Sequence, residues 1–450
     1  MAFNTYYTTT ITTIEGNSLV YSLEQDAAST TPATMNITEK SYNLKYFFND
    51  DNSTRVGLGY LSQLITLQFL ESNEVDDIKT NPLDWRLRIT LDGDLVFLGF
   101  PDVQSISEYA IPSYTDLYEC TFSNVFARLS NESTNAIFST IAASSNPIQA
   151  TSLVPITDLI AEFVVGDLTG ETNLVWVAHE IVSDNCVESG GVLRPDPQLR
   201  YFSVQVPSDV LGNANRTIGE ILTEIARGFY LRMGWSPSQG KTIIAEATAG
   251  ASGTYTGYDC TYSATTHRTI TSSSNITLQT LSSSDFITDG RDVNADNPPF
   301  PKRATTAIQS GSDQIKENPN TTLSFLFDAE VSNSLYWKDD ALSTADKDGI
   351  SVYGRNALDT TNEQKVLFDV YPNRTDTGTQ YELSELINKR LFEDYLFTYG
   401  LKGFTIKTDQ VFDPMIPISY DSKVWVTPSG TINLFEETTD CLLIEIQDNA

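Results

Sequence analysis

The sequence predicts a mainly β protein with a few helices, organised into more than one domain. Short runs rich in Thr, Val, Ile, Tyr and Phe recur along the chain, separated by Gly, Asn, Asp, Ser and Pro, as is typical of strands joined by turns. Only two stretches show the apolar periodicity of a strong amphipathic helix. The 450 residues exceed the usual size of one domain, so we expect about two to four domains.

The clearest strand signal surrounds the dipeptide Asp92-Gly93. Residues 85–91 alternate between apolar and polar side chains. The apolar face of this run carries Trp85, Leu87, Ile89 and Leu91. A second apolar run follows the dipeptide, so the sequence predicts a hairpin with a two-residue turn, because glycine accepts the positive φ that such a turn requires.

The returning strand of this hairpin, within LDGDLVFLGFPDV (residues 91–103), is apolar on both faces. We expect Leu95 and Phe97 to pack inside a barrel. Val96 and Leu98 would then need cover from outside, and Gly99 is expected to end the strand. Such a strand suits a barrel wall that packs against a neighbouring domain or subunit.

Further strands are expected elsewhere in the chain. They lie at residues 64–69, 118–122, 241–247 and 403–408, and the alternation of residues 1–16 predicts another at the N-terminus. Residues 250–284 are rich in Ser, Thr and Gly, so they are read either as edge strands and loops or as an exposed insertion.

Residues 217–233 predict the first strong helix. Its apolar stripe consists of Ile218, Ile221, Leu222, Ile225, Ala226 and Phe229. Thr217 and Glu220 have the spacing of a capping box, and Gly234 is expected to end the helix.

Residues 381–399 predict the second strong helix, which Gly400 is expected to end. Its apolar stripe consists of Leu383, Leu386, Ile387, Leu391 and Leu396. Weaker helices are expected within residues 133–143 and 155–165.

Three stretches rich in Ser and Pro indicate boundaries between domains. They are residues 143–152, 189–198 and 294–303. The last is the strongest linker candidate, because consecutive prolines cannot pair within a sheet.

The charge of the chain limits its partners. It carries 28 basic and 59 acidic side chains, a formal net charge of −31. This charge repels nucleic acid phosphates and anionic membranes, so electrostatically driven DNA binding is disfavoured. A surface past which DNA slides without adhering, or simply a solvated acidic surface, agrees with it.

The sequence gives no sign of export or membrane insertion. Residues 1–16 lack the basic segment and apolar core of a signal peptide, and no stretch reaches the length of a transmembrane helix. Four widely spaced cysteines, without a CxxC pair, are Cys120, Cys186, Cys260 and Cys441. We expect free, mostly buried thiols in a reducing compartment.

The common catalytic and binding motifs are absent from the sequence or incomplete. His179 and His267 are isolated, and neither HExxH nor GxSxG occurs. WSPSQGKT lacks the first glycine of a phosphate-binding loop, so Gly240-Lys241 is read as a turn into a strand. Residues 292–303 lack the glycine and final glutamate of an EF-hand, which leaves only a looser cation site open.

Paired carboxylates of a glycan-active enzyme cannot be selected among 59 acids. A Ser-His-Asp triad is likewise not excluded by composition. No cluster of residues requires chemistry, however. We therefore expect a protein that is not an enzyme, with no catalytic, cofactor-binding or metal site and no cofactor.

The order of elements in residues 81–130 resembles the first barrel of phage tail hub proteins. There, a strand pair crosses a turn of the type x-DG-x-(V/L)-x-F-x-G, and a later strand leads into a short helix like SNVFARLS here. Residues 217–247 resemble the helix, turn and strand of the same family. The helix at 381–399 and the strands to residue 446 resemble its second barrel region.

This resemblance implies two tube-type β-barrels plus peripheral domains. Residues 1–145 would form the first barrel region, residues 146–300 peripheral or intermediate domains, and residues 301–450 the second barrel region. It also implies a homotrimer whose six barrels match a hexameric tail tube, at the baseplate or tail tip of a virion assembled in the host cytoplasm.

The partners implied by the resemblance are tail tube and distal tail proteins and a tip or spike protein, with a tape measure protein as a further candidate. DNA would pass through the ring without specific binding, and an acidic channel would lower friction on its phosphates. Two other classes remain open: a β-rich carbohydrate-binding or receptor-binding tail protein, and a glycan-active enzyme.

Overall fold

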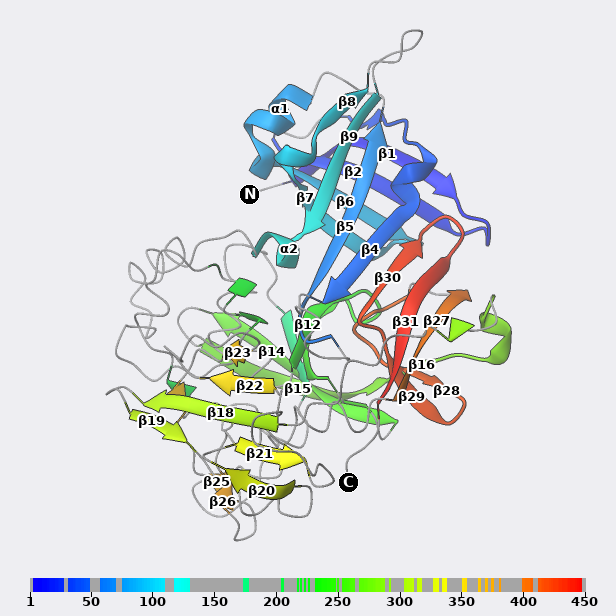
Figure 1. Cartoon of the computed structure of the whole chain (residues 1–450). Coiled ribbons are helices and arrows are strands. Elements are labelled where there is room, and N and C mark those ends of the chain that lie inside the picture. The colour runs from blue at the N-terminus through cyan, green and yellow to red at the C-terminus, as the bar shows by residue number, and fades with distance from the viewer. Residues whose placement is uncertain are drawn as a thin grey trace.

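The structure is a computed structural model of the chain (Figure 1). It describes residues 3–27, 31–48, 57–69, 75–109, 117–129, 173–177, 204–205, 217, 219–220, 222–223, 226, 231–247, 249–250, 253–263, 267–287, 291–292, 303–310, 314–317, 327–331, 334–337, 350–353, 363–365, 369–370, 374–375, 380–381, 399–407 and 412–446.

Seven N-terminal strands form an antiparallel sheet in the order β1–β2–β6–β7–β9–β5–β4. Their bounds are β1 Phe3–Thr12, β2 Ser18–Asp26, β4 Asn43–Phe48, β5 Gly59–Phe69, β6 Trp85–Leu91, β7 Asp94–Pro101 and β9 Leu117–Asn124. In Figure 1, β4, β5 and β9 cross in front of β1, β2 and β6, so that the sheet folds over on itself.

Short elements border this sheet. Strand β3 (Ala33–Thr34) pairs with β1, and strand β8 (Ser107–Tyr109) pairs with β9. The other short elements are the helices α1 (Val75–Thr80) and α2 (Val125–Leu129) and the 3-10 turns η1 (Glu39–Tyr42), η2 (Pro82–Asp84) and η3 (Val103–Ser105). Asn124 ends β9 and caps α2, because its Oδ1 accepts from the backbone N–H of Ala127 at 2.9 Å.

The C-terminal strands extend the same sheet. They are β27 Tyr399–Lys407, β28 Ile418–Tyr420, β29 Lys423–Val426, β30 Ser429–Asn433 and β31 Thr438–Ile446, with β16 (Gln279–Thr280), η4 (Ser283–Asp285) and β17 (Arg291–Asp292) beside them. β31 pairs with β27, β29 and β30. β30 pairs with β4 from Ser429 opposite Phe47 to Asn433 opposite Asn43, so the two ends of the chain share a sheet.

A middle sheet joins them in the order β12–β13–β10–β14–β15. Its strands are β10 Asn173–Val177, β12 Leu231–Ser236, β13 Lys241–Glu246, β14 Thr254–Ser263 and β15 His267–Thr277. β12 lies parallel to the start of β5, with Arg232 opposite Gly59 and Met233 opposite Tyr60. Through this pairing, 21 of the strands that the structure describes form one connected network.

The remaining strands form smaller sheets. A sheet of six contains β18 Arg303–Ser310, β19 Gln314–Glu317, β20 Phe327–Val331, β21 Ser334–Trp337, β22 Ile350–Tyr353 and β23 Glu363–Lys365, and two strand pairs join β11 (Val204–Gln205) to β24 (Asp369–Val370) and β25 (Arg374–Thr375) to β26 (Gln380–Tyr381). β18 is central, since it pairs with β19, β21 and β22.

The chain is therefore mainly β with few helices, as its sequence predicts. The strands expected at residues 64–69 and 118–122 lie within β5 and β9, and those expected at 241–247, 403–408 and the N-terminus correspond to β13, β27 and β1 with shorter or shifted bounds. Within residues 250–284, β14 and β15 pair antiparallel, and β15 is an edge of the middle sheet in the described part of the chain. The two barrels and the three domain boundaries stay predictions.

The helix expected at 217–233 ends earlier than predicted. Thr217 and Glu220 form the capping box, with each backbone N–H donating to the other's side chain, at 3.0 and 3.2 Å. Gly234 does not end the helix but lies inside β12. A Cβ atom there would lie 2.5 Å from the Cβ of Leu61, so glycine permits close packing. Pairing with the next strand, β13, and with the distant strand β5 overrides the local helical pattern.

The first and last residues of the second expected helix, Tyr381 and Tyr399, lie in strands. Tyr381 belongs to β26, and Gly400 lies within β27 instead of ending a helix. Residues 382–398 lie outside the described residues, as do the weaker helices at 133–143 and 155–165.

Two of the three expected linkers also fall outside the described residues. These are 143–152 and 189–198. Of the third, at residues 294–303, only Arg303 is described, as the first residue of β18.

The Asp-Gly hairpin forms as predicted, but its second strand departs from simple alternation. Asp92 and Gly93 have φ of 49° and 94°, as the turn requires. On β6 the four expected residues are buried, since the burial pattern alternates. Ile89 pairs with Phe97 and Thr90 with Leu95, so Val96 is an extra residue in a β-bulge.

Two expectations for this strand are wrong: which of its residues are buried, and where it ends. Val96 and Phe97 are both buried, at 1% and 0% exposure, whereas Leu95 is half-buried and lies with Leu98 on the outer face. Gly99 does not end the strand, which continues to Pro101. The Phe97 ring lies over Gly99, where a Cβ would come within 2.4 Å of Cζ.

We predict that Gly99→Ala destabilises the protein by about 2 kcal/mol or more, because the added methyl also meets the Ser123 carbonyl oxygen at 2.7 Å. Urea denaturation measures the loss. Gly240→Asn is the control, since Gly240 has φ of 60° and nothing within 4 Å of its Cβ position. Equal stability of the two variants would show that the Gly99 contact is not restrictive.

Candidate functional site

A buried cation lies where the three connected parts of the chain meet. Arg232 of β12 is 3% exposed. Its Nη2 donates to the carbonyl oxygens of Thr427, at 2.8 Å, and Pro414, at 3.3 Å. Its guanidinium carbon lies 3.9 Å from the centroid of the Phe48 ring on β4. One side chain thus contacts the N-terminal sheet and the C-terminal segment from the middle sheet.

A buried carboxylate holds the neighbouring turn. Asp413 is fully buried, and its Oδ2 accepts from Ser236 Oγ at 2.5 Å, Ser238 Oγ at 2.6 Å and Ser238 N at 3.1 Å. Its Oδ1 accepts from Met415 N at 2.9 Å. Burial raises the pKa of Asp413, and the hydrogen bonds from Ser236 and Ser238 offset only part of that effect.

Gln279 closes the same junction from β16. Its Nε2 donates to the carbonyl oxygens of Asp413 and Ile416, at 2.8 and 2.7 Å, and its Oε1 accepts from Asp413 N at 3.0 Å. The turn after β12 is therefore fixed to residues far away in the sequence.

A third cluster joins two hairpin turns. Glu437, 6% exposed, accepts a short hydrogen bond from the Thr13 hydroxyl and two bonds from Asn17 Nδ2, at 2.9 and 3.0 Å. Ile14 N donates to Phe435 O at 3.0 Å. The β1–β2 turn and the β30–β31 turn therefore form one unit.

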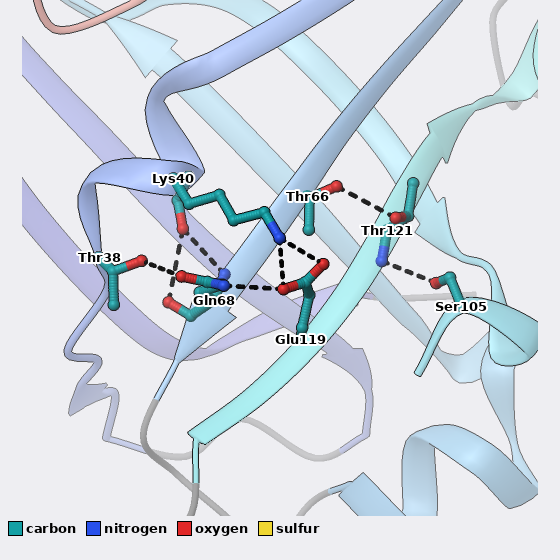
Figure 2. A network of polar contacts seen from close by, with 8 residues as sticks. Thr38, Lys40, Thr66, Gln68, Ser105, Glu119 and Thr121 are labelled. Atoms are coloured by element: carbon teal, nitrogen blue, oxygen red, sulfur yellow. Dashed lines mark hydrogen bonds and ion pairs between the residues drawn. The ribbon is translucent and has the colours of Figure 1, made fainter. Parts of the chain in front are cut away.

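A fourth cluster lies on the outer face of β5 and β9 (Figure 2). Glu119 accepts from Lys40 Nζ at 2.6 and 2.7 Å and from Gln68 Nε2 at 2.7 Å. Gln68 Oε1 accepts from Thr38 at 2.6 Å. Partial burial would raise the pKa of Glu119, but the hydrogen bonds from Lys40 and Gln68 and the charge of Lys40 together lower it.

A small hollow lies between the first sheet and the middle sheet. Its volume is about 40 Å³, room for about three water molecules. It is lined by Gln63, Leu95, Leu98, Asn124, Val125, Phe126, Trp235 and Thr242. Trp235 Nε1 donates to Leu95 O at 3.5 Å. The cover expected for the outer face of β7 thus comes, at Leu95 and Leu98, from within the same chain.

The residues of the incomplete motifs lie in strands and turns wherever the structure describes them. Gly240-Lys241 ends a turn and opens β13, as expected. His267 begins β15, and His179 lies outside the described residues, as does most of the acidic stretch 292–303. Within the described part of the chain, no three His, Cys, Asp or Glu residues lie together in a way that could hold a metal ion.

Two cysteines are free and buried, as predicted. Burial raises the pKa of the Cys120 thiol to about 12 and raises that of Cys441 further, so both resist ionisation. Cys260 lies in β14, and Cys186 falls outside the described residues. Among the helices that the structure describes, none is long and apolar enough to cross a membrane.

The sequence reasoning missed Arg232 and Asp413 as the residues that join the parts of the chain. Arg232 stood within an expected helix, where a cation on the polar face is ordinary. A faint signal existed in Ser236-Pro-Ser238, since two serines around a turn need an acceptor. Nothing in the sequence pairs them with an aspartate 175 residues away from Ser238.

No protein-family model matches the chain, and no curated protein matches it. Solved structures that are similar to it include the tail protein from Neisseria meningitidis MC58, with 10% identity over 94% of this chain and 95% of that chain and a TM-score of 0.43. The 43 kDa tail protein of prophage MuSo2 from Shewanella oneidensis has 9% identity over 92% and 97%, with a TM-score of 0.38.

Prophage tail protein gp18 from Listeria monocytogenes EGD-e has 7% identity over 92% of this chain and 90% of that chain, with a TM-score of 0.36. All three TM-scores are below 0.5, so the function must be argued from the residues of this chain.

We predict that Asp413→Ala costs about 3 kcal/mol of unfolding free energy, because it leaves buried donors of Ser236, Ser238 and Met415 without their acceptor. Urea denaturation measures the change. Asp440→Ala is the matched control, since this exposed carboxylate accepts one bond, from Thr405 at 2.6 Å. Similar losses in both variants would contradict the role of Asp413.

We predict that the melting temperature of Lys40→Met depends less on pH in the acidic range than that of the wild type. The pKa of Glu119 is lowered in the folded protein, so its ionised carboxylate stabilises the fold at pH values above the ordinary pKa of about 4.5. This stabilisation is lost as the pH falls through the lowered pKa. Without Lys40 that pKa rises, so the melting temperature falls less between about pH 6 and pH 3. Lys79→Met, which loses an exposed pair 3.9 Å from Asp76, should behave like the wild type.

Proposed function

We propose that the chain is a structural protein of a bacteriophage tail, without enzymatic activity. In this proposal it forms a trimeric hub at the baseplate or tail tip, joins the hexameric tail tube to the tip and lines the DNA channel. It is assembled in the host cytoplasm and its neighbours are other tail proteins.

The pairing of β4 with β30 carries this proposal. The parts of the chain that resemble the two barrel regions of tail hub proteins lie side by side in one sheet, from Ser429 opposite Phe47 to Asn433 opposite Asn43. A hub subunit that contributes two adjacent segments of a ring needs such a rigid connection between its barrels.

The local elements behind the resemblance also support it. β6, the Asp92-Gly93 turn, β7, β9 and the short helix α2 follow one another in the order that the resemblance implies. The net charge of −31 suits a channel that DNA passes without adhering.

The hollow beside Trp235 is too small to serve as a carbohydrate-binding site. An aromatic side chain beside Gln63 and Asn124 has the chemistry to bind a sugar. Its volume of about 40 Å³ holds only a few water molecules, however, which is less than a sugar ring needs.

Negative-stain electron microscopy of the purified chain tests the hub. We predict a closed ring of three subunits with a central hole. An elongated rod would favour the receptor-binding alternative, and a monomer at high protein concentration would contradict the trimer. Light scattering coupled to size exclusion provides the subunit number independently.

A further inference from the structure

One edge of the N-terminal sheet is open near its corner. β1 pairs with β2 along its whole length, but on its other side β3 pairs only with Tyr7 and Thr8. Met35 N donates to Thr8 O at 2.9 Å, so the backbone groups of Thr8 point away from β2. Strand periodicity places those of Thr10 and Thr12 on the same open side.

Thr10 and Thr12 are exposed, and in the described part of the chain no strand pairs with the open side of β1 there. Strand β1, FNTYYTTTIT, contains no charged residue and no proline, in a chain where 19% of residues are charged. Edge strands usually carry such residues because they prevent another strand from pairing. This edge therefore lacks the usual protection against strand addition.

An exposed apolar side chain lies in the turn that follows this edge. Ile14, two residues beyond Thr12, is 61% exposed. Its turn is held by the bonds of Thr13 and Asn17 to Glu437 and by Ile14 N on Phe435 O. The position of Ile14 is therefore fixed, so little conformational entropy of this turn is lost when a partner contacts it.

The charges beside this corner select the chemistry of the partner. Glu436 is exposed. Lys407 Nζ lies 2.5 Å from Glu15 Oε1, so the positive charge of Lys407 offsets the charge of only one of these two acids. A second copy of the chain would bring the same net charge of −31. A basic segment is attracted instead.

We propose that Thr10, Thr12 and Ile14 form a docking edge for an extended, basic and apolar segment of another protein. The segment adds to β1 as a further strand, with backbone hydrogen bonds to Thr10 and Thr12 and an apolar side chain on Ile14. Strand addition of this kind takes affinity from the main chain and specificity from alternate side chains. The docking edge does not depend on the hub function.

Three labelled peptides test the proposal on the full chain: KTVTVTK, its charge-reversed form ETVTVTE, and KTVPVTK, whose proline interrupts strand pairing. Fluorescence anisotropy measures binding, and hydrogen exchange with mass spectrometry locates it. We expect KTVTVTK to bind, the other two to bind at least about tenfold more weakly, and the amides of Thr10 and Thr12 to exchange more slowly with KTVTVTK.

Variants of the protein separate docking from folding. Thr10→Pro removes an outward N–H at an edge position that tolerates proline, whereas Thr10→Val keeps it. We expect Thr10→Pro and Ile14→Ser to weaken binding of KTVTVTK about tenfold, and Thr10→Val to bind like the wild type, with unchanged circular dichroism in all three. Equal binding of the three peptides, no binding of KTVTVTK, or protection elsewhere overturns the proposal. So does self-association through β1.

Discussion

The buried guanidinium of Arg232 determines how the three connected parts of this chain can sit together. A charge at 3% exposure is costly unless polar groups surround it. The carbonyl oxygens of Thr427 and Pro414 supply those groups from the C-terminal segment, and the Phe48 ring supplies a cation–π contact from the N-terminal sheet. If either segment moved away, the charge would lose partners that water does not replace in the core.

Other features of the junction follow from this arrangement. β12 must approach β5 closely to bring Arg232 into place, and Gly234 permits that approach because a side chain there would meet Leu61. Asp413 then fixes the turn after β12, and the β4–β30 pairing completes one sheet from both ends of the chain. Because the strands of both regions pair in this one sheet, they resist separation together.

Much of the secondary structure was predictable because it depends on local pattern. The alternation of residues 85–91, the Asp92-Gly93 turn and the capping box of Thr217 and Glu220 are determined by neighbours a few residues apart. The bulge at Val96 was not predictable, since it depends on the register with β6.

Other predictions failed because distant contacts override local pattern. Residues 231–233 belong to the helix expected at 217–233 but pair with β13, and Arg232 and Met233 also pair with β5. Glycines at positions 99, 234 and 400 were expected to end elements. Instead, all three lie inside strands, and at Gly99 and Gly234 a neighbouring side chain fills the place of the Cβ. The partners of Arg232 and Asp413 are likewise set by the tertiary fold.

Native-state hydrogen exchange followed by mass spectrometry tests most directly whether the two ends of the chain form one cooperative unit. The account predicts that peptides covering β4 and peptides covering β30 and β31 open with the same free energy, and that both respond equally to denaturant. Exchange of β30 and β31 at a clearly lower free energy than β4 would contradict it, because the C-terminal strands would then separate while the N-terminal sheet stays folded.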